Sequence, residues 1–132
     1  MKNPPLKAAV LISGTGSNLK ALIDAVECGH LNLDIVQVVS NRPEAPGLGH
    51  ARAAAIPFSV IDHKDYPDRQ THDAAVADAL QRAGAELVVL AGYMRILGEE
   101  FANKFAGRMI NLHPSLLPLY KGLDTYDRAL EA

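Results

Sequence analysis

The chain has 132 residues, and 48% of them are hydrophobic, which is enough apolar material for one domain with a core. Its formal net charge of -2 excludes a strongly basic protein, so we expect neither nucleic acid nor a membrane surface as a partner. The single cysteine, Cys28, cannot form an internal disulfide, which favours a reducing, cytoplasmic location. The apolar stretch 8–12 is too short for a signal core or a membrane span.

The chain alternates predicted strands with predicted helices. Apolar runs rich in β-branched residues indicate strands, whereas apolar residues spaced i, i+3, i+4 and i+7 indicate helices. Ser17 or Asn18 is expected to cap the first helix, and Gly29 to close it. Strands are predicted at 8–12, 35–39, 57–61, 87–91 and 109–112. Helices are predicted around Leu19, Leu22, Ile23 and Val26, at 48–55 and 68–83, around Leu97, Phe101 and Phe105, and at 125–132.

This alternation predicts an α/β fold, a Rossmann-like and mostly parallel sheet with helices on both faces, because parallel strands need crossover connections. We expect residues 1–132 to form a single domain. Ligands of such sheets bind beyond the carboxyl ends of the strands. The segments that follow predicted strands and carry polar residues are 14–18, 40–41, 92–97 and 111–113.

The glycine turn Gly14-Thr15-Gly16-Ser17-Asn18 places backbone N–H groups at a helix amino terminus, where an anion is favoured. A dinucleotide fingerprint would need glycine at Leu19, and a P-loop would need glycine and lysine at 19 and 20. A phosphomonoester therefore fits the turn better than either. The alternative is that the glycines only tighten a strand-to-helix turn.

Asn111 and His113 lie two residues apart in an apolar segment that a proline stops. On an extended strand both side chains would project from the same face. Histidine exchanges protons near neutral pH and an amide N–H can stabilise an oxyanion, so the pair suits acyl transfer. The alternative is a turn asparagine beside a hydrogen-bonded structural histidine.

Other chemistry receives less support from the sequence. Arg69 and Arg95 could pair with carboxylates or phosphates, or be solvated surface. The remaining histidines have no metal-ligand spacing, and we assign no metal. A Gly-x-Ser-x-Gly nucleophile motif is absent from the sequence, which favours direct transfer over a covalent intermediate.

Four segments together resemble the phosphoribosylglycinamide formyltransferase family, folate-dependent enzymes of purine synthesis. They are 11–19 (LISGTGSNL), 39–41 (VSN), 90–97 (LAGYMRIL) and 110–118 (INLHPSLLP). The resemblance implies the formyltransferase fold and transfer of a formyl group from 10-formyltetrahydrofolate, the co-substrate, to the amine of glycinamide ribonucleotide.

The resemblance also implies a role for each matching residue. Asn111 would hydrogen-bond the formyl oxygen, and His113 would assist proton transfer. The ribonucleotide phosphate would be held by Thr15, Gly16, Ser17, Asn18 and Leu19. The folate would be held by Arg69, Met94, Arg95, Ile96 and Leu97.

The chain departs from the family pattern at its carboxyl end. Family members continue beyond Ala132 with further strands and an aspartate that orients the histidine, so we expect an incomplete domain with little turnover. Asp124 and Asp127 do not occupy the matching position, and Tyr126 stands where histidine is usual. The rival functions are a formyltetrahydrofolate deformylase and a non-catalytic module that binds a phosphate ligand.

Overall fold

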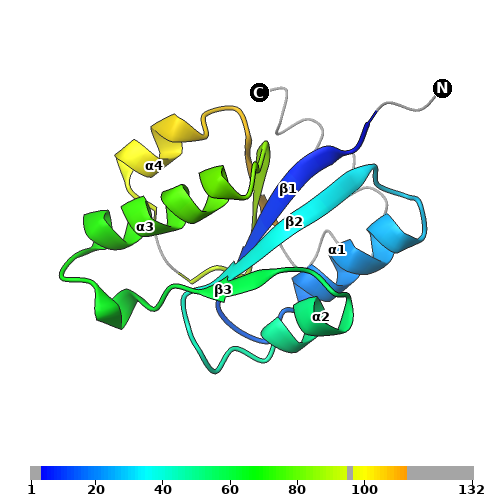
Figure 1. Ribbon diagram of the computed structural model, residues 1–132, viewed down its shortest axis with the longest axis horizontal. Helices are drawn as coiled ribbons and strands as arrows, with labels where there is room; N and C mark the ends of the chain where they lie inside the picture. The colour runs from blue at the N-terminus through cyan, green and yellow to red at the C-terminus, as the bar shows by residue number, and fades with distance from the viewer. Residues whose placement is uncertain (1–3, 95–96, 113–132) are drawn as a thin grey trace.

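The computed structural model describes residues 4–94 and 97–112. Within these residues the strands form one five-stranded sheet in the order β3-β2-β1-β4-β5, and all neighbouring strands are parallel. Figure 1 shows helices on both sides of this sheet, which confirms the predicted α/β architecture. The strands are β1 Leu6–Ile12, β2 Leu33–Ser40, β3 Phe58–Val60, β4 Leu87–Ala91 and β5 Met109–Leu112. The helices are α1 Ser17–Glu27, α2 Leu48–Ala53, the 3₁₀ turn η1 His63–Asp65, α3 Arg69–Arg82 and α4 Glu99–Lys104.

The predicted bounds of β4 and β5 agree with the structure, whereas β3 is shorter than predicted. The prediction that Leu97 belongs to the helix of Phe101 is wrong, because Gly98 has extended backbone and α4 begins at Glu99. The predicted helix 125–132 lies outside the described residues.

Two hydrophobic clusters cover the two faces of the sheet. Successive strand residues project to opposite faces, so Val10 belongs to one cluster and Leu11 to the other. The helices α1 and α2 pack on the Val10 face through Leu19, Leu22, Ile23, Leu48 and Ala51. The helices α3 and α4 pack on the Leu11 face through Val76, Ala77, Leu80 and Phe101, and Phe105, at the C-cap of α4, joins the same cluster. Both faces of the central strand β1 are therefore buried, which explains its continuous apolar run.

The strand order places a topological switch point between β1 and β4. From β1 the chain proceeds outward through β2 to β3, and it then returns to the other side of β1 as β4. The connections that leave β1 and β4 therefore run to opposite faces of the sheet, and ligands of open α/β sheets bind beyond the strand ends at such a point. The fold thus singles out the segments after β1 and β4 as the walls of a ligand site.

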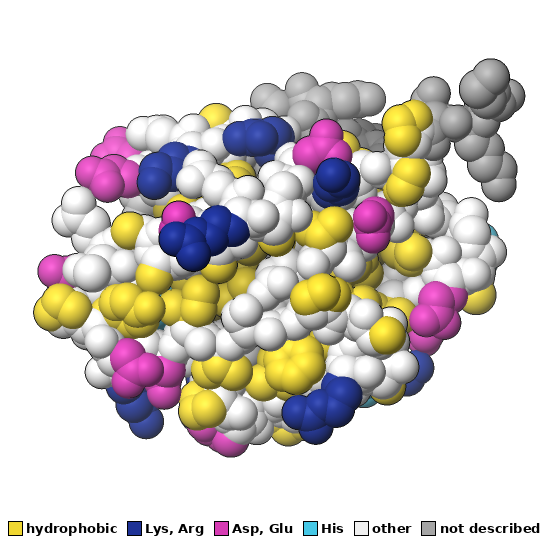
Figure 2. Space-filling view, in the orientation of Figure 1, with side chains coloured by type: hydrophobic (Ala, Val, Ile, Leu, Met, Phe, Trp, Pro, Cys, Tyr) yellow, Lys and Arg dark blue, Asp and Glu magenta, His cyan; other side chains and the backbone are white. Residues whose placement is uncertain are grey.

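Charged side chains of both signs are interspersed over the face of the molecule that Figure 2 shows, with no continuous basic area on that face. Within residues 4–94 and 97–112, the helices are all too short or too polar to span a bilayer.

The amino terminus of α3 is capped by Asp68. Its Oδ1 accepts hydrogen bonds from the Thr71 backbone N–H at 2.8 Å and from the Thr71 hydroxyl at 2.5 Å. The hydroxyl bond first, and then the backbone bond, lower the pKa of Asp68 below its ordinary value of 3.8. The carboxylate is therefore favoured in the folded state.

We expect Asp68→Asn to lower the urea midpoint at pH 7, because the amide still caps Thr71 but loses the charge-assisted bonds. A lowered folded-state pKa stabilises the fold above pH 3.8, and this contribution is lost as the pH falls through the folded pKa. The midpoint difference from the unsubstituted chain should therefore shrink between pH 5 and pH 2. Asp78→Asn, on the exposed part of the same helix, is the control. A difference that stays constant over this range would contradict the prediction.

Candidate active site

The carboxyl ends of β1, β2 and β4 are joined by the hydroxyl of Ser13. Its Oγ donates to Asn41 Oδ1 at 2.5 Å and accepts a hydrogen bond from the Met94 N–H at 2.7 Å. Ser13 is 1% exposed and Asn41 is 3% exposed, so water does not compete for these bonds. The bond to Met94 crosses the switch point, and it fixes the segment after β4 relative to the turn after β1. The sequence reasoning missed this role of Ser13.

Ser13→Ala should lower the free energy of unfolding by about 1–3 kcal/mol, because it leaves the Met94 N–H and the Asn41 amide oxygen without their partner in a buried place. The matched control is Ser59→Ala on β3, whose half-buried hydroxyl accepts from Gln37 alone among the described residues. Urea denaturation of both variants measures the difference. An equal loss for the two would contradict the prediction.

The turn after β1 depends on Gly16, which has a φ of +75° and precedes the first residue of α1. A Cβ at this position would lie 2.5 Å from Cα of Gly47. The two glycine backbones pack directly against each other, and the Gly47 N–H donates to the Gly14 carbonyl at 2.9 Å. The sequence identified the turn but not Gly47 as its partner.

The amino terminus of α1 has no side-chain cap, so the prediction that Ser17 or Asn18 caps it is wrong. Both residues lie inside the first turn of the helix, and the cap position belongs to Gly16, which has no side chain. The bond from the Lys20 N–H to the Gly16 carbonyl, at 2.8 Å, is the first of the helix. The preceding N–H groups, those of residues 17–19, are available to an anion.

The side chains of the predicted phosphate residues differ in exposure. Thr15 and Ser17 are exposed, Asn18 is 7% exposed, and Leu19 is fully buried in the cluster beneath α1. Leu19 can therefore serve a ligand only through its backbone. The structure places the whole turn at the carboxyl end of β1, beside the switch point.

The segment after β4 lies on the other side of the switch point. Met94 is 78% exposed even though its N–H is bound to Ser13. Leu97 is half-buried and packs against the cluster beneath α3 and α4. Arg95 and Ile96 lie outside the described residues. Among the described residues of this segment, Met94 therefore presents an apolar side chain to solvent beside the switch point.

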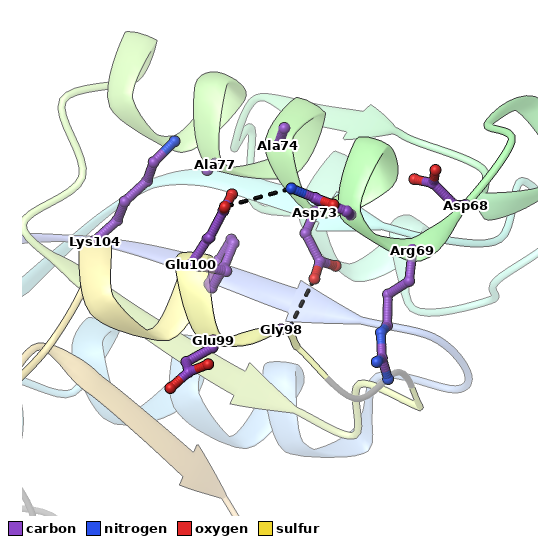
Figure 3. A pocket seen from close by; sticks show the side chains of 11 residues that line it. Asp68, Arg69, Asp73, Ala74, Ala77, Gly98, Glu99, Glu100 and Lys104 are labelled. Atoms are coloured by element: carbon purple, nitrogen blue, oxygen red, sulfur yellow. Dashed lines mark hydrogen bonds between the residues drawn. The ribbon is translucent and has the colours of Figure 1, made fainter.

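A cavity of about 470 Å³ lies between α3 and α4 (Figure 3). Arg69, the first residue of α3, is exposed and contributes to its lining. Asp73 also lines it, is 5% exposed and accepts a hydrogen bond from the Gly98 N–H at 2.8 Å. The sequence prediction did not include Asp73, although the sequence contains a signal for it. Asp73 precedes the apolar residues Val76, Ala77 and Leu80 by three, four and seven positions. This spacing puts a carboxylate on the buried stripe of the helix.

Asn111 lies on β5, opposite Leu90 of β4, and its side chain is exposed. Its neighbours Ile110 and Leu112 belong to the cluster beneath α1, so alternation directs Asn111 to the face that α3 and α4 cover. The predicted partner His113 lies outside the described residues. Asn111 thus stands at the same carboxyl edge of the sheet as the glycine turn and Met94.

A second cavity, of about 310 Å³, lies beyond the carboxyl ends of β2 and β3. Asn41 and Met94 line it from the side of the switch point, and the other lining residues are Arg42, Pro43, Glu44, Asp62, His63 and Lys64. In the described part of the chain, no group of three or more His, Cys, Asp or Glu residues is arranged to hold a metal ion.

The strand order and its switch point, with the uncapped amino terminus of α1 beside it, define an α/β domain of Rossmann-like topology. Residues 6–132 match the family model described as formyl transferase. The chain therefore belongs to the formyl transferase family.

Individual relatives agree with this assignment. The chain is 48% identical over 126 residues to phosphoribosylglycinamide formyltransferase of Haemophilus influenzae, covering 96% of this chain and 59% of the relative. It is similar, with a TM-score of 0.80 and 46% identity, to the structure of the enzyme of that name from Coxiella burnetii, covering 96% of this chain and 60% of the other. The structure of a formyltetrahydrofolate deformylase from Burkholderia mallei is similar with a TM-score of 0.74 and 32% identity, covering 83% of this chain and 38% of the other. The chain thus spans about 60% of the length of the named formyltransferases.

Proposed function

We propose that this chain carries the amino-terminal part of an enzyme that transfers a formyl group from 10-formyltetrahydrofolate to the amine of glycinamide ribonucleotide in de novo purine biosynthesis. The observation that supports this most is the common location of an uncapped α1, Met94 and Asn111 at one edge of the sheet, in a chain of the formyl transferase family. The 48% identity to a named phosphoribosylglycinamide formyltransferase supports the choice of acceptor.

The ribonucleotide phosphate binds at the amino terminus of α1 in this proposal. The N–H groups of residues 17–19 precede the first backbone hydrogen bond of the helix, and the helix dipole adds positive potential there. Thr15 and Ser17 are exposed beside them and can add hydroxyl donors. Gly16 contributes backbone alone, because its packing on Gly47 leaves no room for a side chain.

The folate binds along the segment from 94 to 97. The exposed Met94 and the half-buried Leu97 offer apolar contact to the pterin, and Arg95 and Ile96 are assigned to the same segment by the family resemblance. Arg69 stands at the start of α3 and supplies a guanidinium that can pair with an anionic group of the folate.

The chemical step is assigned to Asn111 and His113. The amine nitrogen attacks the formyl carbon, the new C–N bond forms, and the bond from that carbon to the folate nitrogen breaks. The amine loses one proton and the folate nitrogen gains one, which His113 assists. The Asn111 amide donates to the formyl oxygen while that oxygen carries negative charge. No metal is required in this scheme, and the exposed position of Asn111 on β5 leaves its amide accessible to substrate.

The experiment uses 10-formyltetrahydrofolate labelled in the formyl group, with and without glycinamide ribonucleotide, and measures formylated ribonucleotide and formate. It is run on the 132-residue chain and on a form extended to the length of the relatives. We expect ribonucleotide-dependent transfer by the extended form and little turnover by the shorter chain. Formate release without ribonucleotide would instead support a deformylase.

Thermal-shift titration of the 132-residue chain with the ribonucleotide and with a folate analogue separates binding from turnover. Stabilisation by the ribonucleotide, combined with no transfer by either form, would support a non-catalytic binding module. We further propose small molecules as the only partners of the site, a cytoplasmic location and a single domain over residues 1–132.

A further inference from the structure

The segment between β4 and α4 is held at both of its described ends by buried side chains. At the near end the Met94 N–H donates to Ser13 Oγ at 2.7 Å, and at the far end the Gly98 N–H donates to Asp73 Oδ2 at 2.8 Å. Ser13 is 1% exposed and Asp73 is 5% exposed. The anchors come from different elements, the end of β1 and the buried face of α3. The backbone of Met94 is therefore fixed to the end of the sheet, and the backbone of Gly98 is fixed to a helix.

Gly98 and Asp73 fit each other closely. A Cβ at Gly98 would lie 3.1 Å from Asp73 Oδ2, so a carboxylate takes the space that a side chain at 98 would need. The cap position of α4 has no side-chain hydrogen bond of its own, and Asp73 from the neighbouring helix binds the N–H there. Figure 3 shows Asp73 pointing from α3 toward Gly98.

The second oxygen of Asp73 has no hydrogen-bond partner within the described residues, although it is buried. Desolvating a carboxylate is costly unless its oxygens are bound, so this side chain is not explained by packing alone. A charge-assisted bond is roughly twice as strong as a neutral one, which suits an anchor that must keep a backbone segment in one position.

We propose that Asp73 is a positioning residue, which fixes the far end of the folate-binding segment through the Gly98 N–H. The proposal rests on the proposed function, because that function places the folate along residues 94–97. Holding both ends of the segment before the ligand arrives lowers the entropy that binding must remove. Loss of the anchor should therefore weaken folate binding and leave the α1 phosphate site unaffected.

The first variant is Asp73→Ala, with Asp78→Ala as the control. Asp78 lies on the same helix and carries the same charge, but it is exposed and pairs only with Arg82 among the described residues. The measurements on the 132-residue chain are the dissociation constants of a folate analogue and of glycinamide ribonucleotide, and the exchange rate of the Gly98 amide by NMR. We expect about tenfold weaker folate binding, faster exchange at Gly98 and unchanged ribonucleotide binding for Asp73→Ala, and no change for Asp78→Ala.

The second variant is Gly98→Pro, which removes the donor instead of the acceptor and also places its ring in the space that Asp73 Oδ2 occupies, a contact that the double variant with Asp73→Ala relieves. The φ of -73° at Gly98 is compatible with proline. If both variants act through one hydrogen bond, their double variant should bind folate no more weakly than the worse single variant. Asp73→Asn retains an acceptor oxygen and should recover most of the affinity. If Asp73→Ala does not fold, Gly98→Pro alone measures the loss of the hydrogen bond.

The outcomes distinguish this proposal from the proposed function. If the unsubstituted chain does not bind the folate analogue, the folate assignment of this chain and the role of Asp73 both fail. If the chain binds folate and Asp73→Ala loosens Gly98 with no change in folate affinity, only the positioning role fails. Equal weakening of both ligands, or additive effects in the double variant, would also overturn that role.

Discussion

Asn111→Ala is expected to lower kcat/KM for formyl transfer by about 10²–10³-fold in the form of the protein extended to the length of its relatives. The Asn111 amide is exposed on β5. The backbone of Asn111 pairs with Leu90 of β4 and the neighbouring Leu112 packs into the core, so truncating the Asn111 side chain removes a donor without disturbing the strand. The donor acts on charge that develops only in the transition state. The loss should therefore appear in kcat, with KM for both substrates changed by less than threefold.

The matched control for this prediction is Asn103→Ala, which removes an exposed amide from α4. It should leave kcat/KM within twofold. Full activity of Asn111→Ala, or an effect confined to KM, would refute the assigned role of the amide.

His113→Ala is expected to reduce kcat by at least 10²-fold and to flatten the pH profile of kcat near neutral pH, because the group that exchanges protons is gone.

The elements that could be predicted from the sequence are those in which one physical cause dominates. The strand β4 is an apolar run between a polar residue and a glycine, and burial on both faces accounts for it, whereas β5 buries one face through Ile110 and Leu112. The start of α4 was predicted wrongly, because the apolar Leu97 suggested a helix face. The residue instead precedes Gly98, whose backbone is held extended by a contact with α3. That contact joins residues 25 positions apart and leaves no local pattern.

In the candidate site, too, the local features could be predicted from the sequence, whereas the contacts between distant residues could not. The glycine turn is a local feature, and its place after β1 followed from the sequence alone. Ser13 could not be assigned a role, because its partners are Asn41 and Met94, and only the strand order brings them together. Asp73 could have been found, since an acidic residue on the buried stripe of an amphipathic helix must have a partner. The identity of that partner, a backbone N–H on α4, required the packing of two helices.

Gly16→Ala is expected to destabilise the fold and to weaken ribonucleotide binding by at least tenfold. Two causes act at this position. The φ of +75° costs a residue with a side chain about 1–2 kcal/mol, and the added Cβ would lie 2.5 Å from Cα of Gly47, where backbone must move to make room. Moving Gly47 also strains its hydrogen bond to the Gly14 carbonyl, which holds the turn over the first N–H groups of α1.

Two other glycines separate these causes. Gly29 has a φ of +80° with nothing within 4 Å of an added Cβ, so Gly29→Ala measures the backbone cost alone. Gly14 does not have a positive φ, and nothing lies within 4 Å of a Cβ added there, so Gly14→Ala should carry neither the backbone cost nor the steric cost. Urea denaturation should rank the losses as Gly16→Ala, then Gly29→Ala, then Gly14→Ala. The affinity for the ribonucleotide, measured by titration, should fall for Gly16→Ala and remain unchanged for Gly29→Ala, because Gly16 lies in the turn before α1 and Gly29 does not. If Gly29→Ala weakened ribonucleotide binding as much as Gly16→Ala, the effect would be one of global stability, and the phosphate would not be bound at this turn.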